Sequence, residues 1–210
     1  MNGVGWAVAG CASRSEESTQ AGMQWLACPR ITHAADIPAP AVIILGVPET
    51  ALSEMDGWLA REDLHLSRRV ILHVSGAVPA RVLEACRLRG ASVGSFHPML
   101  ALPDPLTGAK RLRQATFAIE GRPAAVEVMK GIAQSLSGRF FTLSPRGKTL
   151  YHAAGVVASN HLVALLADGH QLLELSGADM AVAGPAFQSL VEGTVQNFYA
   201  QGPVGALTGP

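Results

Sequence analysis

Strand-like and helix-like segments alternate through the first two thirds of the chain, and this alternation constrains the fold more than any other feature. The segments with strand character are 6–11, 41–47, 70–74, 91–96, 116–121 and 139–143. The helix-like segments between them run from a Ser15 cap to about residue 26, over 50–61, from Pro79 onward and over 123–136. This alternation predicts an α/β fold with a mostly parallel sheet and right-handed crossovers. The run AVIILGV at 41–47 is typical of a strand buried on both faces.

The composition shifts at SPRGK, residues 144–148, and the rest of the chain has almost no strand character. An Ala/Leu/Val-rich helix is expected over 148–176, with Gly177 at its C-terminal end, and a second helix over 181–200. Both are apolar on more than one face, so we expect them to pack on each other and on a second copy of the chain. The sequence thus predicts a Rossmann-like domain over 1–144 and a helical dimerisation domain over 145–210.

Charge and cysteine content exclude several classes of protein. The formal net charge is zero, with 16 basic and 16 acidic residues, which argues against nucleic acid as the main partner. The densest basic run, KRLR at 110–113, is expected to be a solvated loop. The three cysteines have no metal-ligand spacing and no apolar run approaches a bilayer span of ~20 residues, so we expect reduced thiols in a cytoplasmic, non-membrane protein.

The first ten residues, MNGVGWAVAG, match the dinucleotide fingerprint G-x-G-x-x-G poorly. Gly3 and Gly5 supply its first pair, but Val8 occupies the third position and Gly10 comes too late. Only two residues precede Gly3, and WAVAG has the character of a strand where the fingerprint needs a helix. The stretch is therefore not expected to be the phosphate-binding loop.

Five motifs carry a family resemblance: HVSGAVPA, GSFHPML, FAIEG, KTLYHAAGVVASNHLVALL and the closing GALTGP. Together they resemble the Rossmann-like family whose C-terminal part is called domain of unknown function 2520. That family is similar to the 6-phosphogluconate-dehydrogenase-like, pyrroline-carboxylate-reductase-like and prephenate-dehydrogenase-like oxidoreductases. The resemblance implies a domain that binds NADP or NAD, followed by a helical domain that completes the active site and often dimerises.

The resemblance also predicts which part of the fold the chain contains. WAVAGCASRS, residues 6–15, resembles the second strand of the family's sheet and the turn after it. The first strand, the glycine turn and the first helix would then precede Met1, and GALTGP usually runs on. We therefore expect an incomplete chain whose sheet has unpaired edges.

Two turns are candidate cofactor contacts. Ser13, Arg14 and Ser15 follow the expected strand at 6–11, where an Arg accommodates the 2′-phosphate of NADP; the alternative is a solvated turn in which Ser15 caps a helix. Val47 and Pro48 end the next strand and resemble the family's turn beside the nicotinamide ribose, or are a plain strand-to-helix turn.

Two strand ends are candidate substrate contacts. Ser75 and Gly76 lie where ligands bind in open α/β sheets, although Ser75 could simply cap a helix. His97 in HPM resembles the substrate-side histidine of prephenate dehydrogenases, and a histidine there can exchange a proton with the substrate hydroxyl. The alternative for His97 is a turn residue before proline.

The helix expected from Lys148 brings polar residues onto one face. At 100° per residue Lys148, His152, Gly155 and Ser159 fall within about 40° of one another, with Asn160 beside them. Relatives carry a Lys and an Asn four residues apart on the corresponding helix, whereas His152 stands four residues after Lys148 here. The proton donor therefore stays open between Lys148, His152 and His97, and the alternative is a solvated lysine with helix-contacting Ser159 and Asn160.

The other histidines have no ligand spacing, so no metal site is expected, and Asn197 and Thr208 are weak candidates for a pocket wall. Two functions remain. One is an NAD(P)-dependent oxidoreductase that moves a hydride between nicotinamide and a small carbonyl, hydroxyl or imine substrate. The other is a non-catalytic binding or dimerisation module that has lost cofactor binding.

Overall fold

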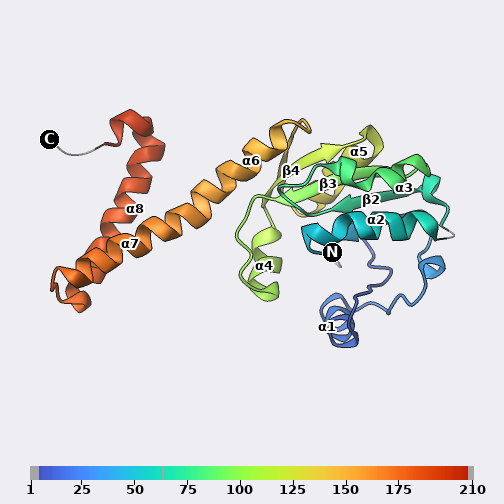
Figure 1. The fold of residues 1–210 in the computed structure, drawn as a ribbon, viewed down its shortest axis with the longest axis horizontal. Helices are drawn as coiled ribbons and strands as arrows, with labels where there is room; N and C mark the ends of the chain where they lie inside the picture. The colour runs from blue at the N-terminus through green and yellow to red at the C-terminus, as the bar shows by residue number, and fades with distance from the viewer. Residues whose placement is uncertain (1–4, 63, 208–210) are drawn as a thin grey trace. The chain divides into compact units, whose positions relative to one another are not determined.

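The computed structural model describes residues 5–62 and 64–207, which include a five-stranded sheet and a set of C-terminal helices (Figure 1). Gly3 and Thr208 lie outside the described residues. The strands are β1 (Ala41–Leu45), β2 (Arg69–His73), β3 (Ser92–Pro98), β4 (Thr116–Gly121) and β5 (Arg139–Thr142). They lie in sequence order; β1, β2 and β3 run parallel, β4 is antiparallel to β3, and β5 is parallel to β4. The expected α/β class is confirmed.

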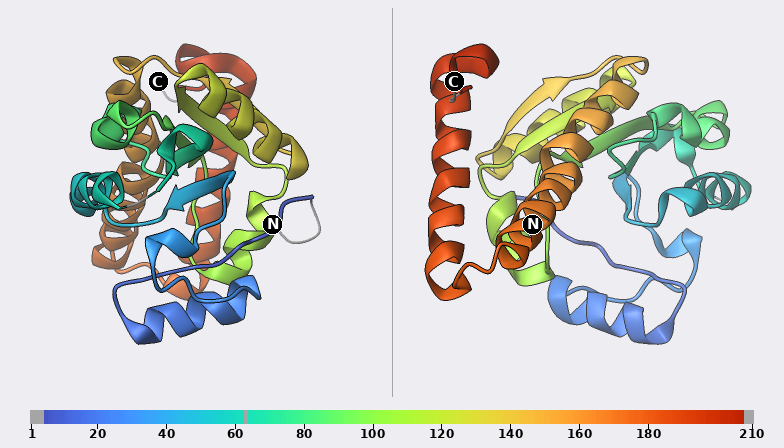
Figure 2. Two further views of the ribbon diagram at one scale, coloured as in Figure 1. Left: turned by 90° about the vertical axis from the view of Figure 1, so that its right-hand side faces the viewer. Right: turned by 60° about the vertical axis from the view of Figure 1, so that its left-hand side comes forward.

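Helices cover both faces of this sheet (Figure 2). One face packs against α2 (Leu52–Arg61) and α3 (Glu84–Leu88), and the other against α5 (Pro123–Ser135). Neighbouring residues of β2 show the alternation, because Ile71 belongs to the first core and Leu72 to the second. Since β3 alternates in the same way, Val93, Ser95 and His97 all face the side of α2 and α3.

Two compact units make up the chain, residues 1–155 and 156–210. The division falls later than the expected boundary after residue 144, because the first turns of α6 (Gly147–Val156) contact the sheet through Lys148 and Tyr151. The long helix expected over 148–176 is confirmed, but it contains a π turn at Val157–His161 before α7 (Leu162–Leu175). Gly177 follows α7 with a φ of 79°, as expected for its C-terminal end.

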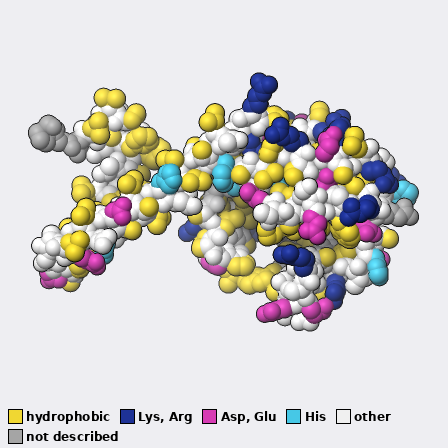
Figure 3. Space-filling view, in the orientation of Figure 1, with side chains coloured by type: hydrophobic (Ala, Val, Ile, Leu, Met, Phe, Trp, Pro, Cys, Tyr) yellow, Lys and Arg dark blue, Asp and Glu magenta, His cyan; other side chains and the backbone are white. Residues whose placement is uncertain are grey.

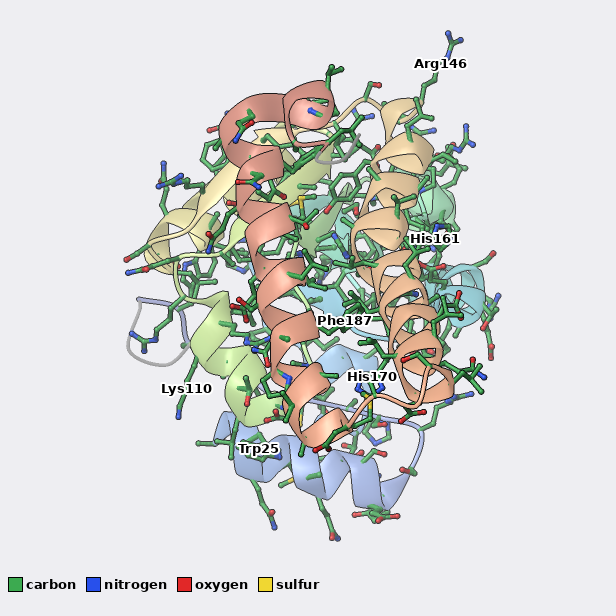
Figure 4. All side chains as sticks on the ribbon, turned by 90° about the vertical axis from the view of Figure 1, so that its left-hand side faces the viewer. Trp25, Lys110, Arg146, His161, His170 and Phe187 are labelled. Carbon is green, nitrogen blue, oxygen red and sulfur yellow. The ribbon has the colours of Figure 1, made fainter. Side chains whose placement is uncertain are left out.

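The second unit is built from α7 and α8 (Met180–Gly205). Gly169 permits their close approach, since a Cβ there would lie 2.7 Å from the Phe187 ring. His170 meets the same ring edge to face at a centroid distance of 6.4 Å (Figure 4). The remaining surface is strongly apolar, with Val163, Leu165 and Leu172 each more than half exposed (Figure 3).

Helical residues 147–175 contain an 18-residue window with a mean hydropathy of 1.4, none of which is buried, so this helix is long and apolar enough to cross a membrane. The expectation that no segment approaches a membrane span is wrong on this criterion. Helices that pack against another protein meet the same criterion, so the finding alone is weak evidence for a membrane.

Three local expectations are wrong. Residues 6–11 do not form a strand of the sheet; Cys11 makes an isolated bridge with Arg30, and Gly10 lies so close to Ile31 that a Cβ would be 2.6 Å from its Cδ1. The segment has few branched side chains and pairs at this one position.

The run KRLR is not a loop, because Lys110, Arg111 and Leu112 end helix α4 (Pro105–Leu112), which Asp104 caps by accepting a hydrogen bond from the Thr107 N–H. Strand β1 is not buried on both faces: it pairs only with β2 among the described residues, and Ile44 is 40% exposed.

Candidate active site

The carboxyl ends of three parallel strands bring the main candidate residues to one edge of the sheet. Gly46, Val47 and Pro48 follow β1, Ser75 and Gly76 follow β2 by one residue, and His97 lies near the end of β3. This edge is where open α/β sheets bind ligands. The structure therefore brings Ser75, Gly76 and His97 together at this edge.

Lys148 reaches this edge from the first turn of α6 and is completely buried. Its ammonium donates a hydrogen bond to Ser95 Oγ, and that hydroxyl donates to the Ser75 carbonyl oxygen at 3.1 Å. No described carboxylate lies within ion-pair distance of Nζ. Lys148 is thus a buried cation held by a serine, which is costly unless the site uses the charge.

Burial lowers the pKa of the Lys148 ammonium from 10.5 to about 8, because an apolar environment disfavours the charged form. The carboxylates of Glu120 and Glu49 oppose the shift. An amine with a pKa of about 8 exchanges its proton readily near neutral pH, whereas an ordinary lysine does not. The environment therefore turns this lysine into an acid and base of useful strength.

His97 is held between Tyr151 and Gly76. Its Nδ1 lies 2.7 Å from the Tyr151 hydroxyl, and the two rings meet edge to face at 5.7 Å. On the other side, a Cβ at Gly76 would lie 2.8 Å from His97 Nε2, so a glycine is required there. The predicted role of Gly76, permitting close approach, thus concerns the His97 ring.

Burial also lowers the pKa of His97 to about 4, and the charges of Lys148 and His152 add to the shift. His97 is therefore neutral at pH 7, with one ring nitrogen protonated and the other free to accept. With the proton on Nε2, the Tyr151 hydroxyl donates to Nδ1; with the proton on Nδ1, the hydroxyl accepts. In either tautomer one hydrogen bond joins His97 Nδ1 to the Tyr151 hydroxyl, so the position of the proton on His97 and the direction of the Tyr151 O–H depend on each other.

Ser75 organises the turn that follows β2. Its hydroxyl donates to Glu49 Oε1 and accepts hydrogen bonds from the backbone N–H groups of Ala77, at 3.1 Å, and Val78, at 2.9 Å. Ser75 therefore caps this turn and not a helix, because the next helical turn begins at Ala80, and its carbonyl also holds Ser95. The exposed Glu49 carboxylate stands at the same edge of the sheet.

His73 is a further buried histidine, at the end of β2. Its Nδ1 accepts a hydrogen bond from the Ser75 N–H at 3.2 Å, while its buried Nε2 has no hydrogen-bond partner among the described residues. Burial, followed by the charge of Lys148, lowers the pKa of His73 to about 4. Two neutral imidazoles and one buried ammonium thus share this edge.

The predicted residues His152, Ser159 and Asn160 take part in none of the hydrogen bonds described above. His152 is exposed, and its charge acts on His97. Ser159 and Asn160 lie in the π turn Val157–His161, where Ser159 Oγ donates to Asn160 Oδ1 at 3.3 Å. Lys148 is buried whereas His152 and Ser159 are exposed, so these polar residues do not share one environment.

Ser13, Arg14 and Ser15 form the exposed turn before helix α1 (Glu16–Leu26). Ser15 caps α1 by accepting a hydrogen bond from the Ser18 N–H at 3.1 Å, and the Ser13 N–H donates to Thr19 Oγ1. The cap predicted for Ser15 is confirmed. Arg14, which stands between Ser13 and Ser15 in the sequence, is exposed.

Sequence reasoning missed four residues of the cluster: Glu49, His73, Ser95 and Tyr151. Ser95 stands two residues before His97, so strand alternation alone places both on one face. Tyr151 stands three residues after Lys148, so helical spacing brings the two side chains to neighbouring positions. Nothing in the local sequence distinguishes Glu49 or His73, because tertiary contacts bring them to the site.

No group of three or more His, Cys, Asp or Glu side chains within 5–62 and 64–207 is arranged to hold a metal ion. The arrangement can give a proton to a ligand at the strand ends and take one back, through Lys148 directly or through the His97 and Tyr151 pair. It can also present a positive charge to an oxygen or a carboxylate.

Two family models match the chain. Residues 1–98 match the Rossmann-like domain, and residues 115–210 match the domain of unknown function 2520. Comparison with curated proteins found no significant match.

Solved structures share the fold at low sequence identity. A Thermotoga maritima protein is 24% identical with a TM-score of 0.71, and the match covers 94% of this chain and 73% of that one. A Bacteroides fragilis protein proposed to be an NADP oxidoreductase is 22% identical with a TM-score of 0.72, covering 99% and 76%. An imine reductase of Streptomyces aurantiacus is 16% identical with a TM-score of 0.65, covering 90% and 67%.

At these identities the likeness shows the fold, which is that of NAD(P)-dependent oxidoreductases. The chain is a Rossmann-like domain followed by a domain of unknown function 2520.

Proposed function

We propose that this protein is an NADP-dependent oxidoreductase that transfers a hydride between nicotinamide and the carbon of a small carbonyl, hydroxyl or imine substrate. The observation that carries the proposal is the buried Lys148 ammonium, with its lowered pKa, beside His97 at the carboxyl ends of three parallel strands. Burying a cation without an ion-pair partner costs free energy, and a substrate oxygen or nitrogen that gains negative charge during the reaction would supply the missing partner.

The strand ends fit the nicotinamide end of a dinucleotide. A Cβ at Gly46 would meet nothing within 4 Å, so a ligand can approach the backbone beside Val47 and Pro48. The exposed Arg14, flanked by Ser13 and Ser15, fits a 2′-phosphate, which favours NADP over NAD. In this proposal these five side chains hold the cofactor, and a bound nicotinamide supplies or accepts the hydride.

In the reductive direction the Lys148 ammonium gives a proton to the substrate oxygen or nitrogen, which gains negative charge as the carbon is reduced. In the oxidative direction neutral Lys148 takes that proton back. Ser95 fixes Nζ at the strand edge, while His97 and Tyr151 can pass a second proton. Ser75 and Gly76 line the substrate side.

The pH dependence follows from the lowered pKa of Lys148, which is about 8. Reduction needs the protonated amine, so its rate falls as the pH rises through about 8. Oxidation needs the neutral amine, so its rate rises over the same interval.

A non-catalytic binding module is the second candidate, and one observation favours it. The turn after β1 leads into a short 3-10 helix whose first residue is Glu49. Its carboxylate places a negative charge at this strand end, and that charge repels a phosphate group. A module of this kind would keep the fold without holding the pyrophosphate of a dinucleotide.

We further propose that the protein acts as a homodimer joined through its C-terminal helices. Within the described part of α7 and α8 no residue is buried, although both helices are rich in Leu and Val. Apolar surface of this extent marks an interface. A second copy would cover it.

NADPH binding separates the two candidate functions. Fluorescence titration should show that NADPH binds at least about tenfold more tightly than NADH, because a charge-assisted contact between Arg14 and the 2′-phosphate is available only to NADPH. Arg14→Ala removes this contact and should abolish the preference for NADPH. Arg113→Ala, another exposed arginine, is the matched control and should leave both affinities unchanged. Absence of binding by either nucleotide would favour the non-catalytic module.

A further inference from the structure

Two cysteines come together beside the Ser13–Ser15 turn. Cys11 forms an isolated parallel bridge with Arg30: its N–H donates to the Pro29 carbonyl at 3.0 Å, and its carbonyl accepts from the Ile31 N–H at 2.8 Å. Cys28 directly precedes Pro29, so the bridge holds the backbone of Cys28 next to that of Cys11. Cys11 and Cys28 do not form a C-x-x-C motif, so the sequence alone does not predict that they pair.

The side chains of this pair have different surroundings. Cys11 is partly exposed; its Sγ lies 3.9 Å from the Thr19 carbonyl and 3.4 Å from the position that a Cβ on Gly22 would take. Cys28 is 8% exposed. Burial raises the pKa of the Cys28 thiol, and a hydrogen bond and charge interaction with the Cys11 thiol raise it further, in keeping with the backbone bridge that holds the two residues side by side.

The third cysteine provides the contrast. Cys86 is completely buried under α2, and its thiol donates to the Asp56 carbonyl at 3.4 Å. Burial raises the pKa of this thiol strongly, so it is inert toward oxidants. All three cysteines are free thiols.

We propose that Cys11 and Cys28 are a redox-active thiol pair that hydroperoxides oxidise to an intramolecular disulfide. The accessible Cys11 thiolate attacks the peroxide oxygen; the O–O bond breaks, the alcohol leaves, and Cys11 becomes a sulfenic acid. The Cys28 sulfur then attacks the Cys11 sulfur, the S–S bond forms, and the S–O oxygen leaves as water with the proton from Cys28. Two thiols lose two electrons, which reduce one hydroperoxide to an alcohol and water.

The disulfide would close a loop that contains the Ser13–Ser15 turn and all of α1. Helix α1 ends at Leu26, and the φ of 48° at the following Ala27 turns the chain directly into Cys28. A covalent link there constrains both ends of the helix relative to each other. This inference does not depend on the proposed enzymatic function, because it rests only on residues 11–31.

Hydrogen peroxide treatment of the full chain tests the proposal. Thiol titration under denaturing conditions should fall from three thiols to one, with no change in molecular mass beyond the loss of two hydrogen atoms. Trypsin cleaves after Arg14 and Arg30, so peptides 1–14 and 15–30 should be recovered joined to each other and should separate on reduction. This mapping needs no variant that could misfold.

Substitutions then assign the sulfurs. Cys86→Ser is the matched control and should still form the disulfide, leaving no free thiol. Cys11→Ser should keep its two thiols, Cys28→Ser should lose the Cys11 thiol to a sulfenic acid, and neither variant should give linked peptides. Oxidation of Cys11 to a sulfinic acid without linkage, a link to Cys86, or disulfides only between separate chains would each overturn the proposal.

Discussion

The sheet unit buries its apolar side chains within the chain, whereas the C-terminal helices α7 and α8 leave theirs exposed. The buried apolar residues that the structure describes lie between Cys28 and Ala133, and most of them form two cores on the two faces of the sheet. The described residues of α7 and α8 include none that is buried, and Leu165, Leu172 and Leu190 are each about two thirds exposed. The first unit therefore carries its own core, whereas the second has the composition of a core and the exposure of a surface.

This difference teaches where each part obtains its stability. Burial of apolar area drives folding, so the sheet unit can be stable on its own. Helices α7 and α8 contact each other at Gly169 and Phe187, which leaves most of their apolar surface for a partner. A second copy of the chain is the partner we propose.

Loss of core volume in the sheet unit should have the largest effect. Ile71 is completely buried in the core under α2 and α3, so Ile71→Ala should lower the free energy of unfolding by about 2–5 kcal/mol. Urea unfolding followed by fluorescence measures the change. Ile44→Ala in β1, where the side chain is 40% exposed, is the control and should cost far less. Equal costs at the two positions would mean that the sheet has no separate core.

Acid should weaken the sheet unit through its buried histidines. The pKa of His73 is lowered to about 4, so the folded state binds fewer protons than the unfolded state between pH 4 and 6.5. This contribution is fully present above pH 6.5 and is lost as the pH falls toward 4, by up to about 3 kcal/mol at 1.36 kcal/mol per pH unit.

His73→Asn tests the acid effect, because its Oδ1 can replace Nδ1 as the acceptor for the Ser75 N–H. The variant should lose part of the pH dependence of unfolding and keep the part that comes from His97, whose pKa is lowered in the same way. Urea unfolding at pH 5 and pH 7 measures both. An unchanged difference between the two pH values would contradict the assignment to His73.

A charge on the helical unit should separate the proposed dimer. Leu165→Glu places a carboxylate on a position that is 68% exposed in the single chain, and it should weaken self-association by about 100-fold, or ~2.7 kcal/mol. Sedimentation velocity over a range of concentrations measures this. Leu88→Glu adds the same charge to an equally exposed leucine of the sheet unit and should leave association unchanged. A wild-type monomer at all concentrations would refute the proposed interface.

The sequence predicted the sheet better than the site. Strands β1 to β5 and most of the helices follow from runs of branched residues, caps and glycine ends, because local chemistry decides those features. Residues 6–11 are the exception, since a strand needs a partner along its whole length and this segment pairs at a single residue, Cys11.

The site was predicted in part. Ser75, Gly76, His97 and Lys148 could be found from their positions at strand and helix ends, and the structure brings them to one edge. Ser95 and Tyr151 were missed because an ordinary serine and tyrosine gain a role only through their contacts with Lys148 and His97. Burial lowers the pKa of Lys148, and because burial results from tertiary packing, no local sequence motif predicts it.

The most direct test of the account is the pKa of Lys148 itself, which requires no substrate. The chain has three lysines, so ¹³C labelling of the lysine ε-carbons gives three NMR signals, and Lys148→Arg identifies the one of interest. The Lys148 signal should titrate at about 8. A Lys148 signal that titrates near the ordinary lysine value of 10.5 would contradict the claim that this lysine is a buried acid at the sheet edge.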